Sequence, residues 1–148
     1  MIIIEMSEEH ISQIAQLEKE CFSVPWSEKS LSEELENPGS HFICAVEDGK
    51  LLGYIGVQEI CGEAYITNVA VFSGFRGRGV GRALLCNACD GAKKRNCEFI
   101  TLEVRKSNEA AISLYVSEGF EQAGIRKNFY SDPVEDGMIY TKYFVRGS

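Results

Sequence analysis

The stretch FRGRGVGRALL, residues 75–85, has the residue types of an anion-binding loop. Three glycines alternate with other residues, three arginines lie among them, and an apolar stretch follows at once. Glycine brings the backbone close to a ligand and tolerates positive φ, while arginine carries a charge that does not titrate. A loop of this kind ahead of a helix is typical of phosphate binding, and three classes of protein use one. The residues concerned are Gly77, Gly79, Gly81, Arg76, Arg78 and Arg82.

Spacing excludes two of these classes. A dinucleotide-binding loop reads G-x-G-x-x-G, but after Gly77 and Gly79 the sixth position is Arg82. A nucleoside-triphosphate loop needs a lysine and a hydroxyl after its second glycine, and the pair Gly74 and Gly79 is followed by neither. Both folds also place the loop after the first strand of the sheet, whereas here it follows the fourth predicted strand. The pattern that remains is R-x-x-G-x-G, between a strand and a helix.

Hydrophobic periodicity predicts the elements that must position this loop. The turn pairs Asp48-Gly49 and Cys61-Gly62 predict three consecutive antiparallel strands. The loop, its helix and the following β-branched run form a strand, helix, strand unit, so the flanking strands are parallel. Predicted strands cover 2–5, 41–48, 50–60, 63–72, 97–104, 120–127 and 138–144; predicted helices cover 8–21, 28–36, 79–94 and 108–119; a polar loop is expected over 128–137.

The segments PWSEKSL, ITNVAV, FRGRGVGRALL, LEVRKSNEAAISLYVSEGF and RKNFY, in this order, carry a family resemblance. Over residues 1–144 the chain resembles the GCN5-related N-acetyltransferase (GNAT) superfamily, and within it the bacterial ribosomal-protein alanine N-acetyltransferases. The resemblance implies one α/β domain with a mixed, mostly antiparallel sheet of about seven strands flanked by about four helices. It also implies transfer of an acetyl group from acetyl-CoA, without a metal, to the N-terminal amine, usually of alanine, of a ribosomal protein.

The same resemblance implies a cofactor site built mainly from backbone groups. The strand segment ITNVAV would meet the pantetheine arm as an added strand meets a sheet. Amides of the glycine loop, at a helix N-terminus, would hold the pyrophosphate without any lysine or metal. An asparagine that opens the next helix would bind the pantetheine side. The implied cofactor residues are Val69, Ala70, Val71, Gly77, Arg78, Gly79, Val80, Gly81, Arg82 and Asn108.

Two further residues fall where the family has its general base and general acid, Glu103 and Tyr115. An ordinary carboxylate is a weak base, so Glu103 acts either with a raised pKa or through a water. The phenol of Tyr115 stays protonated and is a reasonable donor to a leaving thiolate. The alternatives are a family member that acetylates another protein N-terminus or a small amine, and a non-catalytic acyl-CoA-binding module, which would have no reason to keep this pair.

The acceptor side is expected near two aromatic residues. The resemblance implies that the loops at Trp26 and Tyr130 frame the peptide channel, although Trp26 fits a packing role equally well. The family often has R-x-x-Y-Y where this chain reads RKNFY, so Phe129 keeps a ring without the hydroxyl. This departure concerns the acceptor and leaves the acetyl-CoA site unaffected.

Charge is distributed unevenly, which favours an anionic cofactor and a cationic acceptor. The net charge is -7, and residues 1–36 hold nine glutamates against two lysines, whereas residues 76–95 hold six cations against Asp90. No apolar run approaches the roughly 20 residues of a membrane span, and the acidic N-terminus is unlike a secretory signal. We therefore expect a cytoplasmic monomer without membrane or direct nucleic-acid binding. Residues 145–148 are expected to be a tail whose Arg-Gly-Ser end is typical of a vector-derived remnant.

Six cysteines are expected to be free thiols in a reducing compartment. Cys86 and Cys89 form a C-x-x-C pair, but they fall in the middle of a predicted helix, and only His10 and His41 could complete a zinc site. The pair is therefore interpreted as small buried hydrophobic residues.

Overall fold

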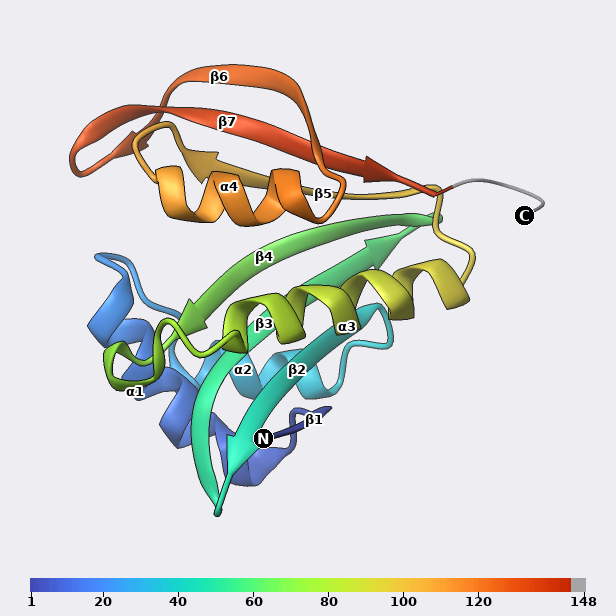
Figure 1. Ribbon diagram of the computed structural model, residues 1–148. Helices are drawn as coiled ribbons and strands as arrows, with labels where there is room; N and C mark the ends of the chain where they lie inside the picture. The colour runs from blue at the N-terminus through green and yellow to red at the C-terminus, as the bar shows by residue number, and fades with distance from the viewer. Residues whose placement is uncertain (145–148) are drawn as a thin grey trace.

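The computed structural model describes residues 1–144, which fold around one seven-stranded sheet (Figure 1). Its strands are β1 (Ile2–Glu5), β2 (Ser40–Glu47), β3 (Lys50–Ile60), β4 (Glu63–Val71), β5 (Phe99–Arg105), β6 (Glu121–Ser131) and β7 (Val134–Tyr143). They lie in the order β1-β2-β3-β4-β5-β7-β6. All neighbours are antiparallel except β4 and β5, which are parallel, and this confirms the predicted mixed sheet.

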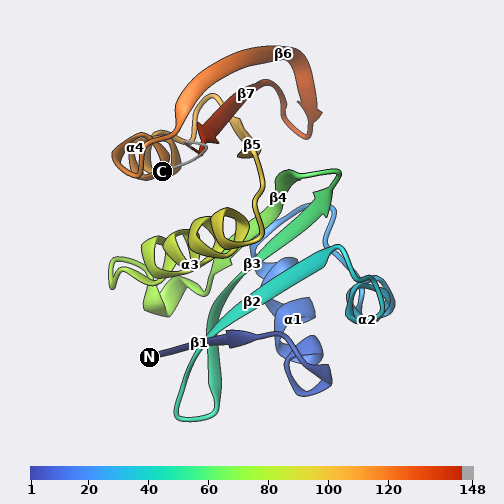
Figure 2. The same cartoon turned by 90° about the vertical axis from the view of Figure 1, so that its right-hand side faces the viewer.

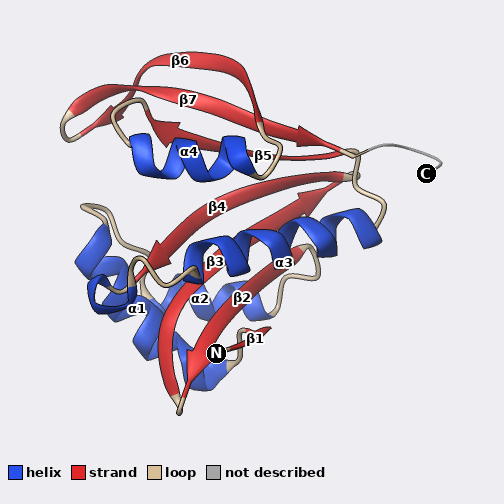
Figure 3. Ribbon diagram, viewed as in Figure 1, coloured by secondary structure: helices blue, strands red, loops and turns tan. Residues whose placement is uncertain are grey.

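The helices cover both faces of the sheet (Figures 2 and 3). Within residues 1–144 they are α1 (Ile11–Cys21), α2 (Glu28–Leu35), α3 (Val80–Lys94) and α4 (Glu109–Ser117), with short 3-10 turns η1 (Glu8–His10) and η2 (Ser73–Phe75). Figure 2 shows α1 and α2 on one face and α3 and α4 on the other. None of these helices is long and apolar enough to cross a membrane. The predicted count of four main helices is confirmed.

Alternation of apolar side chains divides the interior into two cores. Under α3, the side chains of Ile100, Leu102 and Val104 on β5 are buried, because every second residue of a strand faces the same side. Under α1, the residues Ile14 and Leu17 are fully buried against β2 and β3. The other face of β5 is covered by neither pair of helices, and it carries polar residues of the candidate active site.

The parallel strands β4 and β5 pair over three residues and then separate. Glu63 to Tyr65 lie opposite Phe99 to Thr101, and beyond them the two strands diverge (Figure 1). A bulge leaves Thr67 without an opposing residue in β3, which bends β4 away. A Cβ atom on Gly56 would lie 2.5 Å from the Thr67 Oγ1 atom, so glycine is required beside the bulge. The edge of β4 that faces β5 is therefore open.

Three sequence predictions are corrected by the structure. The first predicted helix is η1 followed by α1. The polar loop expected over 128–137 belongs to β6 and β7, which turn tightly at Asp132 and Pro133. A bulge between Arg126 and Tyr130, with Asn128 at φ 53°, interrupts the alternation and hides this strand in the sequence. Cys86 is exposed and its thiol donates to Glu118, 2.9 Å away, rather than being buried. The predicted tail lies outside the described residues.

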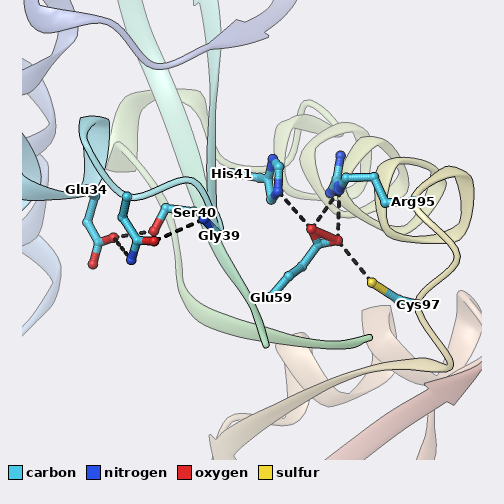
Figure 4. A network of polar contacts seen from close by, with 8 residues as sticks. Glu34, Gly39, Ser40, His41, Glu59, Arg95 and Cys97 are labelled. Atoms are coloured by element: carbon cyan, nitrogen blue, oxygen red, sulfur yellow. Dashed lines mark hydrogen bonds and ion pairs between the residues drawn. The ribbon is translucent and has the colours of Figure 1, made fainter. Parts of the chain in front are cut away.

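A polar network joins the C-terminal end of α3 to the sheet (Figure 4). The Glu59 carboxylate on β3 accepts from the Arg95 Nε atom at 2.7 Å and from the Cys97 thiol at 3.0 Å. The His41 Nε2 atom lies 2.7 Å from the same carboxylate. Burial by itself raises the pKa of Glu59, but the bonds from Arg95 and Cys97 and the electrostatic effect of Arg95 and His41 outweigh it and lower that pKa. The network therefore holds a charged carboxylate with only 12% of its side chain exposed.

Candidate active site

A cleft of about 930 Å³ opens where β4 and β5 separate. Its walls come from the α1–α2 loop, the edge of β4, the polar face of β5, the start of α4 and the β6–β7 hairpin. The structure thus brings together residues from distant parts of the chain. Six residues predicted from the sequence line the cleft: Trp26, Val69, Glu103, Asn108, Tyr115 and Tyr130. Ala70 and Val71 continue β4 beyond the lining toward the glycine loop.

The glycine loop presents unpaired backbone amides at the N-terminus of α3. Gly79 is the N-cap residue at φ 78°, and Gly77 has φ 79°, conformations that favour glycine. The first amide that bonds within the helix is that of Ala83, which donates to the Gly79 carbonyl at 3.0 Å. Amides at the start of the helix have no partner within the helix and can bind an anion. A Cβ atom on Gly81 would meet only the Leu114 Cδ2 atom, 3.7 Å away, so space for a ligand remains there.

The arginines of this loop already have partners on the protein. The Arg78 guanidinium lies 2.8 Å from the Glu47 carboxylate, and that of Arg82 lies 3.3 Å from Glu118. The Arg76 Nε atom donates to the carbonyl of Val71 at 3.2 Å. These acidic partners offset the local positive charge that the sequence suggested. Backbone amides are therefore the main candidates for holding an anion here, with the arginines as exposed neighbours.

The open edge of β4 offers backbone groups to an extended ligand. Val69, Ala70 and Val71 pair with β3 on one side, while their other side faces the gap left by β5. A chain laid along this edge can make the hydrogen bonds of an added strand. The predicted pantetheine segment thus has the geometry that such binding needs.

Glu103 lies on the polar face of β5 and has a cationic partner that the sequence did not predict. Its Oε1 atom is 3.0 Å from the Nε atom of Arg126 on β6, and the two side chains are 28% and 58% exposed. Strand order explains the contact, because only β7 lies between β5 and β6. Glu103 pairs with Ile139 on β7, and Arg126 pairs with Gly137, two residues away on the same face.

Tyr115 reaches the cleft from α4 while most of its ring is buried. The residue is 7% exposed, and its ring centroid lies 5.8 Å from that of Phe120. Burial, with a smaller contribution from Tyr130, raises the pKa of Tyr115 to about 12. The hydroxyl is therefore protonated throughout the physiological range and can donate.

Asn108 caps α4, which confirms that it opens this helix. Its Oδ1 atom accepts from the Ala111 amide at 3.2 Å, an ordinary N-cap bond. The carbonyl of Asn108 also accepts the first helical bond, from Ile112. Its side-chain amide nitrogen can still serve a ligand, and the cap fixes where that nitrogen lies.

Two aromatic residues predicted for the acceptor side line the cleft, Trp26 from the α1–α2 loop and Tyr130 from β6. The ring of Trp26 packs against Phe42 with centroids 5.5 Å apart, so it both packs in the core and lines the cleft. The Arg105 guanidinium lies 4.4 Å above the ring centroid of Tyr130. Burial and the nearby Glu103 charge raise the pKa of Tyr130, while Arg105 lowers it.

Sequence reasoning missed several polar residues of this region. Arg105 and Arg126 reach the cleft only because β5 and β6 are neighbours of β7. Glu18 was detectable, because a carboxylate stood on the same helix face as the apolar Ile14 and Leu17. Within residues 1–144 no group of three His, Cys, Asp or Glu side chains is placed to hold a metal ion.

The fold and the cleft define a class of protein that comparison identifies. The model of the acetyltransferase (GNAT) family matches residues 11–120. The chain therefore belongs to the GNAT family and is an acetyl-CoA-dependent N-acetyltransferase. The membership and fold class predicted from the sequence are both confirmed.

The relatives that it resembles are named as N-acetyltransferases, and some of these names specify a ribosomal protein. It is 38% identical over 127 residues to the ribosomal protein bS18-alanine N-acetyltransferase of Escherichia coli K12, covering 83% of this chain and 84% of that one. It is 34% identical over 122 residues to the N-alpha-acetyltransferase RimI of Mycobacterium tuberculosis, with 78% and 75% covered. The crystal structure of the Escherichia coli S18-alanine enzyme superposes with a TM-score of 0.90, at 32% identity, over 99% of this chain and 96% of that one.

Proposed function

We propose that this protein transfers the acetyl group of acetyl-CoA to the N-terminal α-amino group, preferentially of alanine, of a ribosomal protein. The observation that carries the proposal is that Glu103 and Tyr115 line one cleft beside the open edge of β4. Relatives named for this activity match most of the chain, which supports the choice of acceptor.

An N-terminal amine is the easier nucleophile for this site. Only an unprotonated amine attacks a thioester, and an α-amino group has a pKa of about 7.7 to 8.0, against about 10.4 for lysine. At neutral pH a far larger fraction of N-terminal amines is ready to react. The site then needs only to orient the amine and remove one proton.

We assign the two side chains complementary proton transfers. As the amine nitrogen bonds to the acetyl carbon and the carbon–sulfur bond breaks, Glu103 takes the proton of the amine, directly or through a water. Tyr115 donates toward the departing sulfur. Val69, Ala70 and Val71 would hold the pantetheine arm with Asn108, and residues 77–82 the pyrophosphate. Acetyl-CoA itself supplies the activated thioester.

Acetylation of matched synthetic peptides tests the proposal. One peptide has a free N-terminal alanine, a second has that amine blocked but an internal lysine, and a third has a different first residue. Mass spectrometry should find one added acetyl group on the first peptide and none on the second. Preference for the lysine peptide would refute the proposal, and equal use of every N-terminus would refute the alanine preference.

We also expect the protein to work as a cytoplasmic monomer without nucleic acid. A molar mass near 16.5 kDa by light scattering, unchanged with and without acetyl-CoA, is the expected result. A mass twice as large would contradict it.

A further inference from the structure

A carboxylate is buried on the apolar face of α1. The side chain of Glu18 has no exposed surface, and Ile14 and Leu17 beside it are equally buried. Burying an ionised carboxylate is costly unless hydrogen bonds and charges compensate. A residue in this position therefore needs strong partners, and the mechanism proposed above does not use it.

Three donors from three elements meet at this carboxylate. The Oε1 atom accepts from the backbone amide of Trp26 at 2.9 Å, and the Oε2 atom accepts from the Tyr54 hydroxyl at 2.7 Å and the Asn68 side-chain amide at 3.0 Å. The pKa of Glu18 is raised above its ordinary value, because burial outweighs the lowering effect of these three bonds. A carboxylate is suited to the position because it only accepts, and every neighbour donates.

Two of the three donors come from different elements that line the cleft. Trp26 ends the acceptor loop, which we define as residues 22–26, and Asn68 follows the bulge in β4. The third donor, Tyr54, is fully buried and holds the carboxylate from strand β3 of the sheet. One buried group thus ties the acceptor loop to the strand along which the proposed cofactor segment begins.

We propose that Glu18 is a positioning residue for the acceptor peptide, fixing the acceptor loop against β4. The loop is otherwise mostly exposed from Ser23 to Pro25, and the bond to the Trp26 amide is its link to the buried carboxylate. Loss of this link should weaken acceptor binding more than acetyl-CoA binding, because none of the three donors to Glu18 comes from the glycine loop or α4. The inference rests on the proposed function only where it concerns the KM for the acceptor peptide.

The kinetic test compares Glu18→Ala and Glu18→Gln with the wild type. We expect the KM for the alanine peptide to rise about tenfold in Glu18→Ala, the lower range for losing a hydrogen bond to a charged group. In Glu18→Gln we expect a rise of about threefold, because one amide oxygen still accepts but without the charge. The calorimetric Kd for acetyl-CoA should change less than about twofold in both. Glu33→Gln, an exposed carboxylate of α2, is the control that should behave as wild type.

A fluorescence measurement tests the inference even if no acetyl transfer is found. Trp26 is the only tryptophan of the chain, so its fluorescence reports on the acceptor loop alone. Acrylamide should quench it more strongly in both Glu18 variants than in the wild type, and Glu33→Gln should show no change. If Glu18→Ala does not fold, the near-isosteric Glu18→Gln carries both measurements.

Two results would overturn the inference. Unchanged peptide KM and unchanged quenching in Glu18→Gln, with only a lower melting temperature, would leave the carboxylate a purely structural role. A parallel rise in the Kd for acetyl-CoA would mean that Glu18 supports the cofactor strand instead. Absence of any acetylation by the wild type, with increased quenching in the variants, would refute the proposed function. It would still support the role of Glu18 in fixing the acceptor loop against β4.

Discussion

Replacing Tyr115 with phenylalanine removes one oxygen atom and keeps the buried ring. The ring contact with Phe120 needs no hydroxyl, and the residue is only 7% exposed. We therefore expect the melting temperature to stay within a few degrees of the wild type, as for a change of about 1 kcal/mol in stability. The effect should fall on turnover.

The pKa of Tyr115 sets the size of that effect. At about 12 it lies well above the value of about 8.5 for an ordinary thiol. Complete proton transfer from the phenol to a free thiolate is therefore unfavourable by roughly three powers of ten. The hydroxyl then acts mainly as a hydrogen-bond donor to the departing sulfur, and its removal should lower kcat about 100-fold, the low end of the usual range for general acids.

The assay follows acetyl-peptide by mass spectrometry and acetyl-CoA binding by calorimetry. Detection of the released thiol with a thiol reagent is unsuitable, because Cys61 and Cys86 are exposed and would react. Tyr140→Phe is the matched control, since Tyr140 is also 7% exposed but does not line the cleft. A fall in kcat of less than about threefold, or a Kd for acetyl-CoA raised as much as kcat falls, would refute the donor role.

Four further predictions concern the base, two glycines of the glycine loop and the polar network around Glu59. Glu103→Gln should lower kcat by about 100-fold with acetyl-CoA binding retained in calorimetry, and near-normal turnover would exclude it as the base. Gly81→Ala should keep or slightly raise the thermal stability, since its Cβ meets no close atom, yet raise the calorimetric Kd for acetyl-CoA about tenfold if the pyrophosphate lies against this backbone. Gly79→Ala should instead destabilise the free protein by about 1 to 2 kcal/mol in urea unfolding, because its φ is 78°. Glu59→Gln should cost about 1 kcal/mol at pH 7, a modest value because Arg95 is 37% exposed. Because the pKa of Glu59 is lowered in the folded state, the extra stability of the wild type over Glu59→Gln is fully present above pH 4.5, the ordinary pKa. This extra stability is lost as the pH falls through the lower folded-state pKa. An equal difference in unfolding free energy at pH 7 and pH 3 would contradict this.

Local features were predictable because short segments determine them. Asp48-Gly49 and Cys61-Gly62 do form tight turns, with all four residues at positive φ, because glycine adopts that backbone freely and the flanking segments have the alternation of strands. Asn108 does cap α4, through a bond within its own turn. In contrast, the strand over 128–137 was missed because a bulge at Asn128 breaks the two-residue period on which strand prediction depends.

The sequence by itself determined the family, the glycine loop ahead of a helix, and Glu103 and Tyr115 as the candidate catalytic pair. These features depend on residue types at fixed spacing. They can be read from the sequence because backbone geometry acts over only a few residues. Only the tertiary structure decided what surrounds them: Arg126 against Glu103, carboxylates against the loop arginines, and the buried Glu18 beneath Trp26. Such contacts join segments far apart in the chain, and they arise from strand order and from where β4 parts from β5, which no local pattern specifies.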